Sequence, residues 1–143
     1  MQPPPSQPQP SVRLLCQVSI VYDAVLGLML LAGQSWIERL TGLAALNYPV
    51  NGQLNGLFAL SIAAGYWIPL RGLGGGRLYL WVFGVALKAA GAVLITLRVL
   101  ALGDPPSFLV FSLFDGLLAL WTWQILHRLA TAGHAPTQRR PPC

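Results

Sequence analysis

The chain is 143 residues long, 55% of its residues are apolar, 9% are charged, and its formal net charge is +5. Because a soluble domain of this length needs a charged surface, the composition argues against a soluble protein and indicates one membrane domain. The positive charge does not indicate nucleic-acid binding, since most arginines flank apolar segments and no basic stripe with interleaved aromatic residues is present.

The sequence contains no motif that is typical of a soluble enzyme. Cys16 and Cys143 form no CxxC pair and no Cys/His cluster with the spacing of metal ligands. No nucleophile motif and no dinucleotide-binding fingerprint is present either. We therefore expect no metal site and no evident cofactor, and the motifs leave open whether the protein is an enzyme.

The first apolar segment follows a short polar stretch. Residues 1–12, MQPPPSQPQPSV, carry no charged side chain and are rich in proline and glutamine, which predicts a disordered tail. A membrane-spanning helix is expected over about 14–32, with Asp23 near its centre. Ser19 lies one turn before Asp23 and Gly27 one turn after it, so this polar and small stripe should face other helices.

The segment 33–53 mixes apolar and charged residues. Its spacing fits a short helix that lies in the membrane interface, with Trp36 and Tyr48 as anchors. A plain surface loop explains the same residues equally well. In either case Pro49 and the polar residues after it should end the segment.

A second span is expected over about 54–70. Ala59 and Ala63 lie four residues apart in it, so another helix backbone can approach closely on that side. Tyr66 and Trp67 near its end suit the belt of aromatic residues at a membrane interface.

The third span contains a charged residue. Residues 71–77, RGLGGGR, should form a turn, and the run LYLWVFGVALKAAGAVLITLRVL at about 78–100 then carries Lys88 near its middle. A lysine at this depth costs ~2.5–3.5 kcal/mol on insertion scales, so it needs a partner or a wet cavity. Gly84 and Gly91 on the same face would let neighbouring helices close around it.

A break at residues 103–106 precedes the fourth span, which is expected over about 108–126. One face of this helix carries polar and small residues, namely Ser112, Asp115, Ala119 and Thr122. The last residues, 131–143, are polar and rich in proline, which predicts a second disordered tail. The expected organisation is a transmembrane domain over 13–130 between the two tails.

The distribution of basic residues predicts the topology. Four spans place both termini on one side of the membrane. That side would carry six basic residues, Arg13, Arg71, Arg77, Arg128, Arg139 and Arg140, against Arg39 and Arg98 on the other side. The positive-inside rule then predicts an all-α, antiparallel, four-helix transmembrane bundle with both termini in the cytoplasm.

Three charged residues should meet inside this bundle. Counting residues from the ends of the expected spans, at ~1.5 Å each, places Asp23, Lys88 and Asp115 in the middle third of the bilayer. The three would carry one net negative charge if all were ionised. Because two carboxylates at one site repel each other, we expect one to pair with Lys88 and the other to be protonated or to bind a cation.

Three interpretations of this cluster remain open, and no residue is assigned a catalytic role. The first is a structural ion pair that fixes which helices meet. The second is a membrane redox or lipid-substrate process, with Asp23 or Asp115 as acid or base towards a quinone or another lipid-soluble molecule and Tyr22 as a helper. The third is movement of a proton or small cation, which would require a homo-oligomer or a membrane partner subunit.

Several segments resemble a known group of proteins. They are YDAVLGLMLL at 22–31, GYWIPLR at 65–71, WVFGVALKAAGA at 81–92 and FSLFDGLLALWTW at 111–123. In this order they resemble small bacterial four-span membrane proteins of the broad DoxX-like group, over about 13–128. The resemblance implies a four-helix bundle in a bacterial inner membrane. Some members of the group are associated with quinone-linked sulfur oxidation, but none of its catalytic residues matches a position here.

Overall fold

The computed structural model describes residues 9–32, 36, 39 and 49–132, and this part of the chain is helical without a β-strand. The elements are α1 (Pro10–Ala32), α3 (Pro49–Gly65), α4 (Trp67–Arg71), α5 (Leu73–Tyr79), the π-helix η1 (Leu80–Leu87), α6 (Lys88–Leu102), the short 3₁₀-helix η2 (Pro106–Phe108) and α7 (Leu109–Ala132). The expected all-α class is therefore confirmed. The interfacial helix or loop expected over 33–53 lies largely outside the described residues.

Three helical stretches are long and apolar enough to cross a membrane. They are Pro10–Ala32, Leu73–Leu102 and Pro106–Thr131, and each exceeds the ~20 residues that a hydrocarbon core requires. Large apolar side chains on them point outward, for example Leu28 at 56% and Leu94 at 60% exposure. A soluble protein would bury such residues, so these helices indicate a membrane protein.

The region expected as the second span is helical but interrupted. α3 begins at Pro49, which was expected to end the preceding segment and instead starts a helix, a position that proline tolerates because the first turn needs no backbone donor. The helix breaks at Tyr66 and continues as the five-residue α4. Neither piece alone is long enough to count among the candidate spans.

The predicted turn over residues 71–77 is much shorter in the structure. Only Gly72 separates α4 from α5, and residues 73–77 are already helical. A side-chain carbon added at Gly76 would collide with Pro69, so this glycine allows α5 to pack directly on α4. That packing explains why a glycine-rich sequence forms a helix here rather than a loop.

The stretch Leu73–Leu102 is not a uniform α-helix. Its middle, η1, is a π-helix that ends at Leu87, and α6 begins at Lys88. In a π-helix each N–H bonds to the carbonyl five residues back, so the helix winds more slowly and the faces before and after it are rotated relative to each other. η1 therefore helps to set the direction in which Lys88 points.

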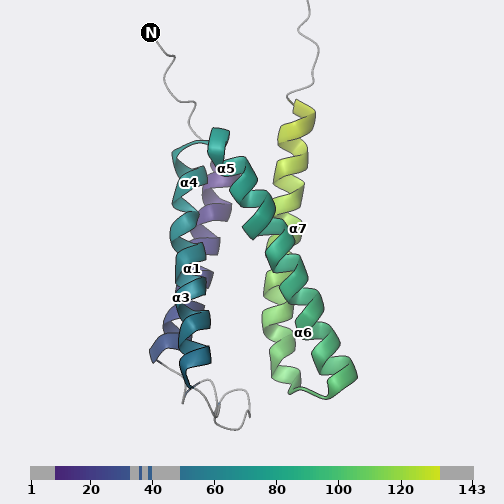
Figure 1. Cartoon of the computed structure of the whole chain (residues 1–143). Helices are drawn as coiled ribbons and strands as arrows, with labels where there is room; N and C mark the ends of the chain where they lie inside the picture. Colours follow the sequence, from purple (N-terminus) through teal and green to yellow (C-terminus); the bar gives the residue numbers. More distant parts are fainter. Residues whose placement is uncertain (1–8, 33–35, 37–38, 40–48, 133–143) are drawn as a thin grey trace, which may run out of the picture.

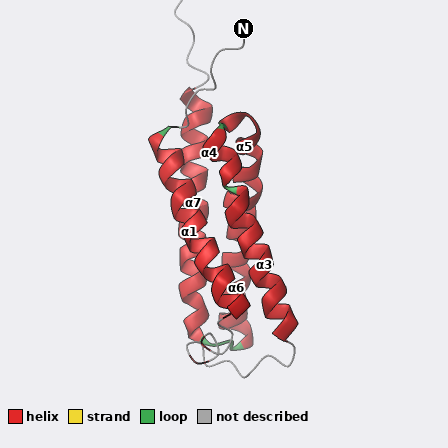
Figure 2. Ribbon diagram, turned by 90° about the vertical axis from the view of Figure 1, so that its left-hand side faces the viewer, coloured by secondary structure: helices red, strands yellow, loops and turns green. Residues whose placement is uncertain are grey.

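The helices pack in two close pairs, α1 with α3 and α6 with α7, and η1 also packs on α7. Figure 1 shows the two pairs, and Figure 2 shows the long helices side by side along one axis. α1 and α3 approach closely at Gly27 and Gly56, where a side-chain carbon added to either glycine would lie 2.8 Å from the carbonyl oxygen of the other. Residues this small allow the two backbones to touch.

α1 begins and α7 ends at the same end of the molecule (Figure 1). A hydrophobic core lies towards this end. Its buried members come from α1, from the α3–α4 junction, from η1 and from α7: Val12, Leu15, Cys16, Tyr66, Leu80, Leu118, Ile125 and Leu126. The charged cluster described next lies further along the helices.

Candidate functional site

The structure brings together the three charged residues that the sequence placed at similar depth. Lys88 Nζ donates a hydrogen bond to Asp23 Oδ1 at 2.7 Å and another to Asp115 Oδ1 at 3.3 Å. The three side chains come from α6, α1 and α7. We refer to Asp23, Lys88 and Asp115 as the charged cluster.

The two carboxylates of the charged cluster differ in their surroundings. The side chains of Lys88 and Asp23 are each 6% exposed, whereas that of Asp115 is 19% exposed. Asp23 is therefore both the nearer and the more deeply buried partner. Asp115 completes the cluster from a longer distance and is partly open to its surroundings, so it is the carboxylate that a bound molecule could reach more easily.

The ring of Tyr22 lies beside the charged cluster. Its ring centroid lies 4.8 Å from Lys88 Nζ, a cation–π geometry. The ring also stacks on Phe114, with centroids 5.9 Å apart. The Tyr22 hydroxyl lies near the Asp115 carboxylate but outside hydrogen-bond geometry. Tyr22 therefore contacts the lysine through its ring and not through its oxygen.

Several buried polar atoms near the cluster have no hydrogen-bond partner among the described residues. They are Ser19 Oγ, Tyr22 Oη, Asp23 Oδ2 and Tyr66 Oη. Buried polar atoms in native proteins are nearly always hydrogen-bonded, to protein or to ordered water. Tyr66 lies close to Ser19 and Tyr22 lies close to Asp115, so a water molecule or a small shift of these side chains can complete the network.

Tyr66 was expected in the interfacial belt, and this prediction is wrong. The residue is fully buried, at 0% exposure, while its neighbour Trp67 is 58% exposed. Tyr66 lies at the break between α3 and α4, which turns its side chain inward to pack edge-on against Tyr79. Hydropathy could not have predicted the burial of Tyr66, because an aromatic residue near the end of a span is usually interfacial.

Two hydroxyl groups that were not expected as a pair connect α6 to α7 on the far side of the cluster. The Thr96 and Ser112 hydroxyl oxygens are 2.6 Å apart, and Ser112 Oγ also donates to the Ala92 carbonyl at 2.8 Å. Ser112 was expected on the polar face of its helix, whereas Thr96 was not expected to contribute. These groups are satisfied within the protein, so they stabilise the α6–α7 contact.

A pocket of about 530 Å³ reaches the charged cluster. Asp23, Lys88 and Asp115 form part of its wall, and most of the remainder is apolar, including Leu26, Phe58, Ile62, Phe83, Leu87 and Leu94. Its volume lies within the range of ~300–1,000 Å³ that is usual for small-molecule sites.

Part of the pocket wall is exposed on the outward apolar surface of the helices. Phe58 and Leu94, which line it, are 53% and 60% exposed on the outward apolar surface. α1 and α3 supply one part of the lining, and η1 and α6 supply another. A molecule entering by this route would come from the lipid rather than from water.

The described part of the chain holds no group of three or more His, Cys, Asp or Glu side chains that could bind a metal ion. Cys16 is a buried free cysteine in the hydrophobic core. Comparison of the chain with family models, curated proteins and solved structures gave no match.

Proposed function

We propose that the chain is a bacterial inner-membrane protein that binds a lipid-soluble small molecule in the pocket beside the charged cluster. The observation that carries this proposal is the pocket itself: an apolar cavity, open towards the lipid-facing surface, whose inner wall holds Asp23, Lys88 and Asp115. A quinone or another isoprenoid with a polar head has the shape and polarity that this wall would accept.

In the membrane we propose an antiparallel four-helix bundle with both termini in the cytoplasm. The first half of α1 lies near α4 and its second half lies near α3. Contacts that run in opposite directions along two segments are those of antiparallel neighbours. Counted together, residues 49–71 would extend ~34 Å at 1.5 Å per residue, enough to cross despite the break at Tyr66. The excess of arginines at the end of the molecule where α1 begins supports the orientation.

The broad DoxX-like group remains the proposed relationship. It is supported by the order of the segments in the sequence and by an all-helical fold in which three stretches can span a membrane. The quinone-linked activity of some of its members agrees with the class of ligand proposed here.

The cluster has suitable groups for a polar head. Lys88 Nζ can donate to a carbonyl oxygen, while Asp115, the more exposed carboxylate, can accept from a hydroxyl group or exchange a proton with it. Asp23 is held by its short contact with the lysine, so it would keep the ammonium group in place when a ligand competes for Asp115. In this scheme the two carboxylates have different roles because their exposures differ.

Two exposed alanines give a matched test of the pocket. Ala90 lines the pocket, whereas Ala86, one turn earlier on the same helical stretch, does not line it. We expect Ala90→Phe to weaken binding of a short-chain quinone in mild detergent at least tenfold, because the ring would fill the cavity. Ala86→Phe should bind like the unchanged protein, as followed by equilibrium dialysis or by quenching of tryptophan fluorescence. Equal binding by both variants, or no binding by the unchanged protein, contradicts the proposal.

The alternative function is movement of a proton or small cation by a small subunit or a homo-oligomer. The buried polar atoms without partners favour it, because Ser19, Tyr66, Asp23 and Tyr22 could carry a chain of water molecules towards the cluster. A pH-driven flux in proteoliposomes that Asp115→Asn abolishes, in protein that binds no quinone, would support this function over ligand binding.

A further inference from the structure

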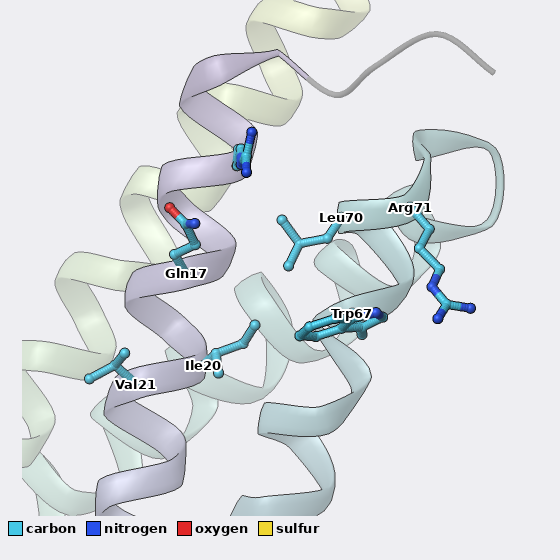
Figure 3. Close-up of a pocket in the computed structure, with 7 residues that line it drawn as sticks. Gln17, Ile20, Val21, Trp67, Leu70 and Arg71 are labelled. Carbon is cyan, nitrogen blue, oxygen red and sulfur yellow. The ribbon is translucent and has the colours of Figure 1, made fainter. Parts of the chain in front are cut away.

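A second cavity lies outside the charged cluster, in a groove between the first half of α1 and α4. Its volume is about 710 Å³, and it shares no lining residue with the pocket at the cluster. Seven residues line it: Arg13, Gln17, Ile20, Val21, Trp67, Leu70 and Arg71. Figure 3 shows Trp67 and Leu70 projecting from the α4 region towards α1, where Ile20 lies opposite them. We call it the arginine groove.

The basic residues of the arginine groove have no acidic partner in the described part of the chain. Arg13 and Arg71 are both exposed. The described aspartates pair elsewhere, Asp23 and Asp115 with Lys88 and Asp104 with Arg98. The two guanidinium groups leave positive charge along the groove. This charge attracts anions, and arginine suits phosphate in particular because its planar fork can donate two parallel hydrogen bonds.

The remainder of the arginine groove is apolar and lies deeper along the helix. Ile20 and Val21 follow Arg13 by two turns of α1, a rise of ~11–12 Å at 1.5 Å per residue. Val21 and Trp67 are 63% and 58% exposed, so this part of the groove faces outward within the apolar surface. A tryptophan beside arginines is the usual arrangement at the boundary between lipid head groups and acyl chains.

We propose that the arginine groove binds an anionic phospholipid. The phosphate would bind at Arg13 or Arg71 on the rim of the groove, with Gln17 of α1 as a further hydrogen-bond donor, and an acyl chain would cover Ile20, Val21 and Trp67. The positive charge of the groove favours an anionic head group. The apolar part of the groove favours a lipid over a soluble phosphate, because only a lipid has an acyl chain to cover it. The bound lipid would tie α1 to α4 at the end of the molecule where the hydrophobic core lies.

The test uses the full chain, stripped of lipid in a neutral detergent. Thermal unfolding is measured with added phosphatidylglycerol, with phosphatidylcholine of the same acyl chains, and with inorganic phosphate at matched concentrations. The variants are the double change Arg13→Gln with Arg71→Gln, and the control Arg77→Gln, which removes an exposed arginine of α5 outside the groove.

The proposal expects phosphatidylglycerol to raise the melting temperature of the unchanged protein and of the control, and phosphatidylcholine to have little effect on either. The double variant should bind phosphatidylglycerol at least tenfold more weakly, since it lacks both charges. Native mass spectrometry of protein that retains lipid gives the same comparison without unfolding, in case the double variant is unstable.

Three results would overturn the proposal. One is an equal response to both lipids, which would remove the role of charge. Another is an equal loss in the Arg77→Gln control, which would place the effect outside the groove. The third is an equal stabilisation by inorganic phosphate, which would mean that the apolar part of the groove is not used.

Discussion

The geometry of the charged cluster predicts that Lys88 is coupled more strongly to Asp23 than to Asp115. A double-mutant cycle can measure both coupling energies. The variants are Lys88→Met, Asp23→Asn and Asp115→Asn, with the two double changes that combine the lysine with either aspartate. Each substitution removes a charge while keeping the side-chain volume similar. The difference between the pairs follows from their distances of 2.7 Å and 3.3 Å and from the greater exposure of Asp115.

The distances give a first estimate of the magnitudes. At an effective dielectric constant of ~20, the Coulomb energy is about 6 kcal/mol for the Lys88–Asp23 distance and about 5 kcal/mol for Lys88–Asp115, before desolvation. Screening at the partly exposed Asp115 lowers the second value further. We therefore expect the coupling of Lys88 to Asp23 to exceed its coupling to Asp115 by at least about 1 kcal/mol.

The single variants should differ in the same order. Lys88→Met leaves the buried Asp23 carboxylate and the partly buried Asp115 carboxylate without their cation, so it should lower the free energy of unfolding by ~3–5 kcal/mol. Asp23→Asn removes the closer partner and should have a similar effect. Asp115→Asn leaves the pair of Lys88 and Asp23 neutral and intact, so its effect should be the smallest of the three.

The assay is unfolding in detergent, with accumulation in the membrane recorded for each variant. Asp104→Asn is a matched control, because Asp104 and Arg98 form an ion pair of 2.6 Å at the surface and exposed pairs contribute little. Its effect should be much smaller than that of Asp23→Asn. A Lys88–Asp115 coupling equal to or larger than the Lys88–Asp23 coupling would refute the reasoning, and so would a Lys88→Met variant as stable as the unchanged protein.

Two further predictions concern packing around the cluster. Gly27→Ala and Gly56→Ala should each destabilise by ~1–3 kcal/mol, because the new carbon meets a backbone carbonyl at 2.8 Å. Gly91→Ala should be tolerated, since its new carbon would lie 3.5 Å from Asp115 Oδ2, and thermal unfolding compares the three. Tyr22→Phe keeps the ring and removes a hydroxyl without a partner, so stability should stay the same or rise by up to ~1 kcal/mol. Tyr22→Leu should lower stability by ~1–2 kcal/mol through loss of the cation–π contact; equal losses in both variants would show that the hydroxyl is bonded.

Hydropathy and residue counting predicted the parts of the fold that depend on burial alone. The centres of the apolar segments at Asp23, Lys88 and Asp115 could be compared in depth because every residue of a helix advances it by ~1.5 Å. Polar and small residues at helical spacing then pointed to the faces that pack together. Those two arguments were enough to place three charged side chains from distant parts of the sequence at one site.

The same arguments could not predict local breaks in the helices. η1 depends on backbone hydrogen bonds to the fifth residue, and its sequence, LWVFGVAL, looks like any apolar helix. The helical conformation of residues 73–77 depends on the contact of Gly76 with Pro69, a tertiary contact that overrides the low helix propensity of glycine. The burial of Tyr66 follows from the break beside it, so it could not be predicted before that break was known.

The composition of the charged cluster itself supports a role beyond holding helices together. One carboxylate within 2.7 Å already neutralises Lys88, and a second negative charge nearby repels the first. That second carboxylate, Asp115, is the more exposed of the two and lies on the wall of the pocket, where a ligand or a proton could offset its charge. If stability alone had shaped the site, a neutral residue at position 115 would pair the helices equally well. The Asp115→Asn variant therefore separates the two roles: we expect it to fold normally and to lose binding of the lipid-soluble molecule.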